Sequence, residues 1–198
     1  MTTTDPRPAA QRPAGAADST TEWRTRDIVV VAVIAVAFGI FFWAFGFIWS
    51  GLAFLGPLQN VLYGAWLLPA IVAPLIVRKP GAALFAEVVA AGLSAILGSQ
   101  WSIDTLLSGV LQGGAAELVF LAVRYRSWSV PVVVVASLAS SAAAFVHDWL
   151  VYFATYDAAA LAAIGAFMAV SGVLVLPLVA IALVRAIRRT GVLEGFPA

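Results

Sequence analysis

The chain of 198 residues has no cysteine and a single histidine, His147. The lack of cysteine excludes disulfides, thiol nucleophiles and thiolate metal ligands, and one histidine cannot build a multi-histidine metal centre. The sequence also lacks a Gly-x-x-x-x-Gly-Lys-Ser/Thr loop, a Gly-x-Ser-x-Gly elbow and a His-Glu-x-x-His helix. We therefore expect no cofactor and no catalytic centre, and any ATP-driven transport would need an ATPase on another subunit.

Charged side chains are scarce, at 11% of the chain, whereas apolar residues make up 63% and the mean hydropathy is +1.01. A soluble domain of this length cannot bury so much apolar surface, so its solvent is expected to be lipid. One crossing of a bilayer needs about 20 apolar residues. The predicted fold class is an all-α integral membrane protein with six transmembrane helices. Their expected ranges are 28–49, 58–77, 82–98, 104–123, 130–153 and 160–184.

Lysine and arginine are absent from every second break between these apolar runs. All eleven basic residues precede the first run or follow the second, fourth or sixth. Short loops rich in Lys and Arg stay in the cytoplasm, so both termini are predicted to be cytoplasmic. The six-helix domain is expected to span residues 23–190, and residues 191–198 to form a cytoplasmic tail. Residues 1–22 have no apolar core and are predicted to be a disordered cytoplasmic tail.

Three of the predicted spans contain an acidic residue, namely Glu87, Glu117 and Asp148. A charge at bilayer depth costs about 3 kcal/mol on insertion scales, so each acid should face the protein interior. At about 1.5 Å per residue, Asp148 lies roughly 8 Å below the outer end of its span, Glu87 about 17 Å and Glu117 about 21 Å. Asp148 is thus a candidate wall of an outward-open cavity, and the glutamates form its floor or lie beneath it. Alternatively, each acid is neutral and holds helices together by hydrogen bonds.

Polar and aromatic side chains accompany these acids in the outer half of the predicted bundle. Carboxylates, amides and aromatic rings together suit a small, flat, nitrogen-rich ligand that carries positive charge. His147, next to Asp148, is another candidate. On a helix the two side chains point roughly 100° apart, so both can hardly face one cavity. The further candidate site residues are Asn60, Tyr63, Trp66, Gln100, Trp101 and Gln112, and Gln59 and Asp104 are polar neighbours of the same region.

Tryptophan and small residues indicate two further features. Trp49, Trp101 and Trp149 lie at predicted outer boundaries, as in an aromatic belt, whereas Trp66 lies in the middle of a span. Small residues also recur every four positions in the third span, which allows another helix of this bundle or of a partner to approach closely. They are Ala82, Ala86, Ala90 and Ser94.

Short motifs are distributed over about residues 24 to 195. They are Pro57, Tyr63-Gly64-x-Trp66, Ile76-Val77-Arg78-Lys79-Pro80-Gly81-Ala82-Ala83 followed by Glu87, Leu97-Gly98-Ser99-Gln100-Trp101, Gln112-Gly113-Gly114-Ala115-Ala116-Glu117, and Ser140-Ser141 leading to His147-Asp148. With six spans, this pattern resembles the YkoE family of substrate-binding (S) components of energy-coupling factor (ECF) transporters, associated with thiamine or its hydroxymethylpyrimidine (HMP) moiety. The family's usual fourth-span motif is Gln-Gly-Leu-Gly-Ala-Glu, so Gly114 and Ala115 depart from it, while Glu117 stays in register.

The resemblance implies a receptor in a bacterial cytoplasmic membrane that binds its vitamin from outside. It also implies docking on a transmembrane coupling subunit with two ATPase subunits, with no nucleic acid as partner; the docking face stays open. In thiamine, the aminopyrimidine suits Glu87 or Glu117, and the cationic thiazolium suits Asp148 beside aromatic faces. Those faces belong to Tyr63, Trp66 or Trp101, and Asn60, Gln100 and Gln112 would complete the hydrogen bonds.

Other functions are compatible with the same acids. A proton-coupled or facilitative transporter would use Glu87, Glu117 and Asp148 as a relay and would work without partners. An intramembrane enzyme would use the carboxylates as acid and base, but no nucleophile motif accompanies them. A membrane scaffold would not explain the polarity of the outer half. We therefore expect a non-enzymatic transporter subunit.

Overall fold

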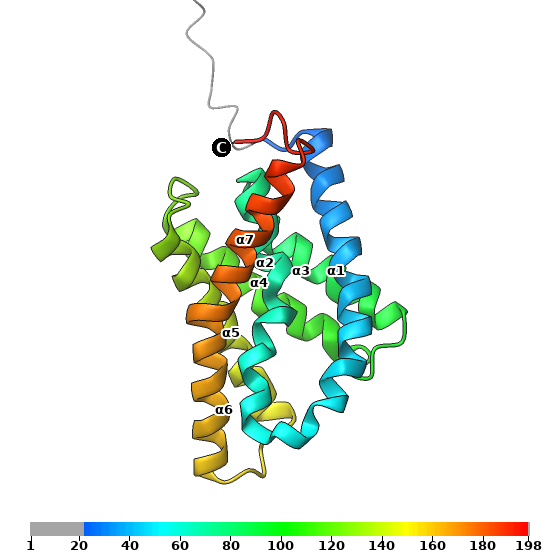
Figure 1. The fold of residues 1–198 in the computed structure, drawn as a ribbon, viewed down its shortest axis with the longest axis vertical. Helices are drawn as coiled ribbons and strands as arrows, with labels where there is room; N and C mark the ends of the chain where they lie inside the picture. Colours follow the sequence, from blue (N-terminus) through cyan, green and yellow to red (C-terminus); the bar gives the residue numbers. More distant parts are fainter. Residues whose placement is uncertain (1–21, 198) are drawn as a thin grey trace, which may run out of the picture.

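The computed structural model describes residues 22–197, and within that range every regular element is a helix. The disordered tail expected for residues 1–22 falls, apart from Glu22, outside the described residues. The elements are α1 (Thr25–Gly51), a 3₁₀ segment η1 (Ala53–Leu67), α2 (Leu68–Val77), α3 (Ala82–Ile96), α4 (Asp104–Ala122), α5 (Val130–Val151), α6 (Ala158–Val170), a π segment η2 (Ser171–Val175) and α7 (Leu176–Arg189) (Figure 1).

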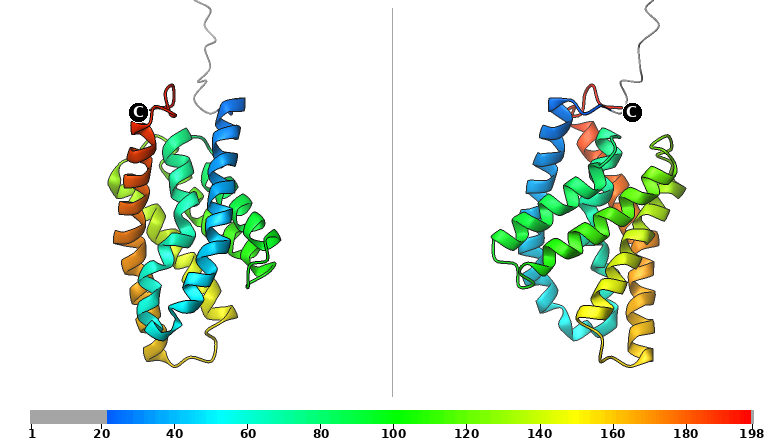
Figure 2. Two further views of the ribbon diagram at one scale, coloured as in Figure 1. Left: turned by 45° about the vertical axis from the view of Figure 1, so that its right-hand side comes forward. Right: turned by 180° about the vertical axis from the view of Figure 1, so that it is seen from behind.

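Five helical stretches are long and apolar enough to cross a membrane: α1, η1 with α2, α4, α5, and α6 through α7. The sixth predicted span corresponds to that last stretch, and the third corresponds to α3, which is apolar but has only 15 residues. At 1.5 Å per residue α3 is about 22 Å long, shorter than the roughly 30 Å of a bilayer core. Figure 2 shows α3 and α4 running obliquely to the other helices.

The second predicted span begins earlier than expected and is not α-helical throughout. It starts at Ala53 as 3₁₀ turns that are interrupted at Gly56, where φ is 55° and glycine is favoured. The stretch then continues as α2, and all ten residues of α2 are buried. A helix that is apolar on every side belongs in the interior. The chain from η1 to α2 is accordingly the central helix of the bundle (Figure 1).

The π segment η2 is tied to this central helix. Its first residue, Ser171, is fully buried, and its Oγ accepts a hydrogen bond from the backbone N–H of Gly64 at 2.8 Å. Gly64 lies in the 3₁₀ segment, where the backbone leaves N–H groups that need such partners. The bond therefore fixes the stretch of η1 that carries Tyr63 and Trp66.

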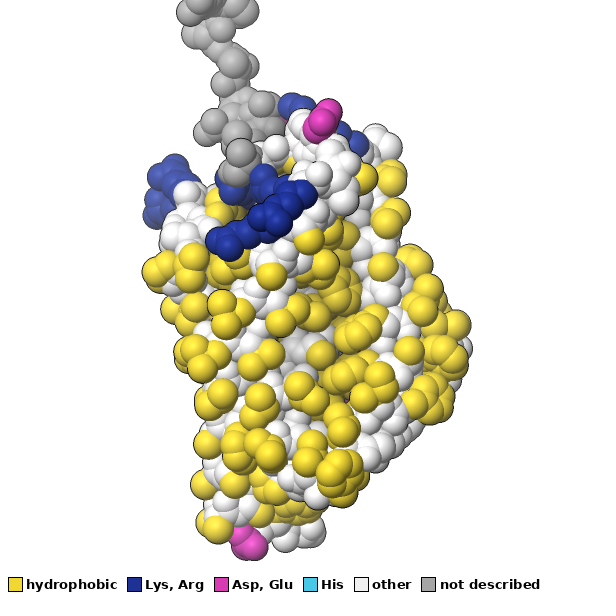
Figure 3. Space-filling model, viewed as in Figure 1, with side chains coloured by type: hydrophobic (Ala, Val, Ile, Leu, Met, Phe, Trp, Pro, Cys, Tyr) yellow, Lys and Arg dark blue, Asp and Glu magenta, His cyan; other side chains and the backbone are white. Residues whose placement is uncertain are grey.

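The beginning of α1 and the end of α7 lie at the same end of the bundle (Figure 1). Lys and Arg side chains gather at this end, and the sides of the molecule are mostly apolar (Figure 3). Residues 191–197, predicted as part of a tail, pack against the start of α1. The Arg26 guanidinium donates a hydrogen bond to the Gly195 carbonyl and lies 4.7 Å from the centre of the Phe196 ring.

The stripe of small residues in α3 packs inside this bundle. Ala82, Ala86, Ala90 and Ser94 are all buried. A Cβ added to Gly39 of α1 would lie 2.9 Å from the carbonyl oxygen of Ala90, so α1 and α3 touch backbone to backbone. Small residues allow this close approach within lipid.

Gly113 and Gly114 are neighbours in α4 with opposite surroundings. A Cβ at Gly113 would lie 2.8 Å from Cβ of Glu87 and 3.1 Å from Cα of Leu84, whereas a Cβ at Gly114 would meet nothing within 4 Å. We expect Gly113→Ala to lower the free energy of unfolding by about 2 kcal/mol through overpacking. Gly114→Ala should raise it by up to about 1 kcal/mol through helix propensity. Thermal unfolding of the two variants in detergent checks this, and equal midpoints would contradict it.

Candidate ligand-binding cavity

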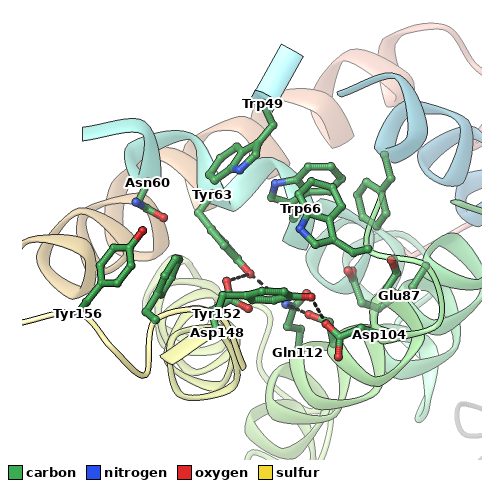
Figure 4. A pocket seen from close by; sticks show the side chains of 17 residues that line it. Trp49, Asn60, Tyr63, Trp66, Glu87, Asp104, Gln112, Asp148, Tyr152 and Tyr156 are labelled. Atoms are coloured by element: carbon green, nitrogen blue, oxygen red, sulfur yellow. Dashed lines mark hydrogen bonds between the residues drawn. The ribbon is translucent and has the colours of Figure 1, made fainter. Parts of the chain in front are cut away.

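A cavity of about 360 Å³ lies between α1, η1, α3, α4 and α5. It is near the end of α1 and the end of α5, in the half of the bundle away from the Lys/Arg-rich end. This volume is typical of small-molecule sites in proteins. Seven of the ten predicted site residues line the cavity: Asn60, Tyr63, Trp66, Glu87, Trp101, Gln112 and Asp148 (Figure 4). Gln100, Glu117 and His147 do not line it.

One wall of the cavity is aromatic and centres on Trp66. Its indole lies 5.3 Å from the Phe42 ring, 6.2 Å from Trp49 and 5.2 Å from Trp101, measured between ring centres. Trp49 also meets Tyr63 edge-on at 5.8 Å. Such mutual contacts hold the ring faces in place. The wall can therefore receive a flat or cationic ring without first ordering its own side chains.

The opposite wall is acidic. Glu87, Asp104 and Asp148 place three carboxyl groups on the cavity, and among the described residues no Lys or Arg lines it. Electrostatic attraction is stronger in a protein interior than in water because screening is weaker there. The cavity therefore favours a ligand that carries positive charge or several hydrogen-bond donors.

Asp148 belongs to a hydrogen-bond chain that joins η1, α4 and α5, and Figure 4 shows its bond with Tyr63. The Tyr63 hydroxyl donates to Asp148 Oδ2 at 2.7 Å, and His147 Nδ1 lies 2.9 Å from Asp148 Oδ1. On its other side, His147 Nε2 lies 3.2 Å from Asp104 Oδ1, and the Tyr152 hydroxyl donates to Asp104 Oδ2. His147 thus stands behind the cavity and positions the two aspartates that line it.

Glu87 lines the cavity and also caps the start of α2. Its side chain is 1% exposed, and Oε2 accepts a hydrogen bond from the backbone N–H of Ala70 at 2.9 Å. Ala70 lies in the first turn of α2, where N–H groups have no partner within the helix. A carboxylate at this position also interacts favourably with the helix dipole. Glu87 is therefore held in a fixed position at the inner side of the cavity.

Glu117 performs the same capping role elsewhere, away from the cavity. Its carboxylate accepts hydrogen bonds from the backbone N–H groups of Gly81 at 2.6 Å and Ala83 at 3.0 Å, at the start of α3. The Tyr125 hydroxyl donates to it as well, at 2.6 Å. Burial and this carboxylate raise the pKa of Tyr125, which keeps its proton on the phenol. Of the two expected locations for Glu117, the structure shows the one beneath the cavity.

The amide side chains differ in their roles. Gln112 Nε2 donates to Ser108 Oγ and lies 3.4 Å from the Tyr63 hydroxyl, so it supports the same chain as Asp148. Asn60 Nδ2 donates to the Pro57 carbonyl at 3.0 Å, while its buried Oδ1 has no protein partner. Gln100 accepts from Ser50 Oγ at 2.9 Å and holds the loop after α3 against α1. Asn60 Oδ1 is thus an acceptor left for a ligand.

Several lining residues were not among the candidates. The sequence predicts Trp49 in an outer aromatic belt and Asp104 only as a neighbour of the acids, yet both line the cavity. Tyr152, Phe153 and Tyr156 also line it, from the end of α5 and the segment that follows. The available signal was the dense aromatic run just after the His147-Asp148 motif. Hydropathy does not separate such a run from a belt at the lipid interface.

The chain matches known proteins over most of its length. Residues 26–143 match the family described as ABC-type cobalt transport system, permease component. The chain is 34% identical over 178 residues to YkoE of Bacillus subtilis (strain 168), which is named an HMP/thiamine permease protein; the match covers 87% of this chain and 88% of that one. A crystal structure of an S component of an ECF transporter is similar with a TM-score of 0.83 and 34% identity, covering 88% of this chain and 90% of that chain.

The predicted resemblance is confirmed by this extent of similarity and by the shared helical fold. Multi-pass S components of this kind lie in the bacterial inner membrane. The chain belongs to the YkoE family of S components of ECF transporters.

Proposed function

We propose that this protein is the subunit of an ECF importer that binds thiamine or its precursor HMP with high affinity. The observation that carries the proposal is the composition of the cavity wall: three carboxyl groups face a cluster of aromatic rings, without a basic side chain among the described lining residues. A cationic aromatic ligand complements both sides at once. The relative from Bacillus subtilis is named for HMP and thiamine, which agrees with this chemistry.

The two rings of thiamine suit different parts of the cavity. Its thiazolium ring is a permanent cation and suits Asp148 and the aromatic wall around Trp66. Its aminopyrimidine ring carries an amine donor beside ring nitrogens and suits Glu87, which is already fixed by Ala70. The unpartnered Asn60 Oδ1 offers one further acceptor for a donor on the ligand. HMP shares the pyrimidine but lacks the cation, so the two ligands test the two halves of the cavity separately.

The proposal also covers the orientation of the chain in the membrane and the subunits with which it assembles. We place six spans in the membrane, with α3 as the short third span and both termini in the cytoplasm, because Lys and Arg gather at their end of the bundle (Figure 3). The ligand cavity then opens toward the outside. A transmembrane coupling subunit and two ATPase subunits would supply the energy, since the S component itself is not an enzyme and carries no P-loop motif.

The competing functions receive less support. A proton relay was expected to run through Glu87, Glu117 and Asp148, but Glu117 is engaged with the start of α3, outside the cavity. One family description refers to cobalt. Among the described residues, no group of three or more His, Cys, Asp or Glu side chains is placed to hold a metal ion. An organic ligand is therefore the better match to the side chains that line the cavity.

A fluorescence titration tests the proposal directly. Trp49, Trp66 and Trp101 line the cavity, so ligand stacked among them should quench their emission. We expect saturable quenching of the detergent-purified protein by thiamine or HMP at submicromolar concentration, without any other subunit. Absence of quenching by both ligands in folded protein would reject the proposal. Uptake by this chain alone that stops when the proton gradient collapses would favour a proton-coupled transporter instead.

A further inference from the structure

A second cavity, of about 530 Å³, lies at the Lys/Arg-rich end of the bundle, separate from the ligand cavity. Val77, Tyr125, Trp128 and the segment around Phe196 form its apolar and aromatic part. Figure 3 shows basic side chains gathered at this end, directly beside the apolar flank of the molecule. Its charged lining residues are Arg24, Arg26, Arg78, Lys79 and Asp27.

Asp27, the one acid among the described residues that line this cavity, already has partners. Asp27 Oδ2 accepts a hydrogen bond from the backbone N–H of Arg24 at 3.0 Å, which holds the first turn of α1. Its Oδ1 lies 3.7 Å from Arg26 Nε. Among the described lining residues this carboxylate faces three arginines, Arg24, Arg26 and Arg78, so their side chains carry an excess of positive charge that attracts anions.

Arg78 is a basic lining residue with an unused hydrogen-bond donor. Its Nε is buried and has no hydrogen-bond partner, while its guanidinium lies 5.9 Å from the centre of the Trp128 ring. Burial and the neighbouring charge of Arg188 lower the pKa of Arg78. A buried donor without a partner is costly. An anion in the cavity would supply the missing acceptor and offset the repulsion between the two arginines.

We propose that this cavity binds a phosphate group, either that of an anionic phospholipid headgroup or a free phosphate ion. Guanidinium groups match phosphate in geometry as well as charge. The basic side chains at this end lie beside the apolar flank (Figure 3). Trp23, which precedes the lining residue Arg24, donates a hydrogen bond to the Pro80 carbonyl at 2.9 Å. Tryptophan is typical of headgroup depth, and basic pockets between helices on the cytoplasmic side bind anionic headgroups. The proposal is independent of which ligand occupies the first cavity.

Native mass spectrometry of the full chain in neutral detergent tests the proposal with three probes: phosphatidylglycerol, phosphatidylcholine and inorganic phosphate. We expect phosphatidylglycerol to bind at least tenfold more tightly than phosphatidylcholine. Arg78→Gln should weaken phosphatidylglycerol binding at least fivefold. Arg126→Gln removes the same charge from an exposed position at the same end and outside the cavity, and should change it less than twofold. Arg26→Gln, at a half-exposed lining position, serves if Arg78→Gln fails to fold.

The outcomes separate the two sources of phosphate. Binding of phosphatidylglycerol that inorganic phosphate does not displace assigns the site to a lipid. Binding of inorganic phosphate alone, lost in Arg78→Gln, assigns it to a free ion. The proposal is overturned if phosphatidylglycerol shows no preference over phosphatidylcholine and inorganic phosphate does not bind. Equal losses in the Arg78 and Arg126 variants would likewise overturn it, because they would reflect the overall charge of this end.

Discussion

Replacing Asp148 with alanine is expected to weaken thiamine binding about 100-fold, which corresponds to about 2.8 kcal/mol. The change removes a buried negative charge from the cavity wall and leaves the Tyr63 hydroxyl and His147 Nδ1 without their shared partner. A buried polar group that loses its partner costs free energy beyond the lost attraction. Isothermal titration calorimetry with purified protein gives the affinity directly.

Asp148→Asn separates the charge of this residue from its shape. Asparagine keeps an acceptor for Tyr63 but has no charge, so thiamine should bind at least tenfold more weakly while HMP changes less than threefold. Asp157→Asn is the control, since Asp157 accepts a hydrogen bond from Ala160 N at the exposed start of α6, outside the cavity. Equal losses for thiamine and HMP would show that Asp148 does not meet the cationic ring.

Replacing Glu87 with glutamine is expected to weaken binding of both ligands about 30-fold, or about 2 kcal/mol. The pyrimidine amine, present in thiamine and in HMP, would lose a charged acceptor, and hydrogen bonds to charged groups are the stronger ones. The variant should still fold, because the glutamine oxygen can accept from the Ala70 N–H. A titration in which thiamine and HMP compete for the variant compares their two affinities under the same conditions.

Glu117→Gln is the matched control for this variant. Both glutamates accept backbone N–H groups at the start of a helix, but only Glu87 lines the cavity. We expect both variants to lower the thermal midpoint to a similar extent, since both weaken a charged helix cap. Only Glu87→Gln should change ligand affinity by more than twofold. A similar loss of affinity in Glu117→Gln would trace the effect to the packing of α3 rather than to ligand contact.

The helical segments were predictable because they depend on local composition. The fourth predicted span, 104–123, corresponds to α4 at Asp104–Ala122, and the fifth, 130–153, to α5 at Val130–Val151. The predicted second span begins five residues late, at 58 rather than at Ala53, since hydropathy does not register the 3₁₀ turns around Gly56. The extent of the ligand site was less predictable. The sequence predicts Trp49 as a residue of the outer aromatic belt, whereas in the structure it packs edge-on against Tyr63.

The sequence by itself determined the class of the protein and its family. Apolar runs, the alternate distribution of Lys and Arg and the motifs from Tyr63 to Asp148 are all local or additive features. Only the tertiary structure decided which acid serves the cavity. Glu87 and Glu117 look alike in sequence, each an acid deep within an apolar span, and both cap a helix. The helices α3 and α4 run obliquely to the others (Figure 2). Glu87 lines the cavity whereas Glu117 binds the start of α3 outside it, because the surroundings of a side chain depend on how neighbouring helices cross.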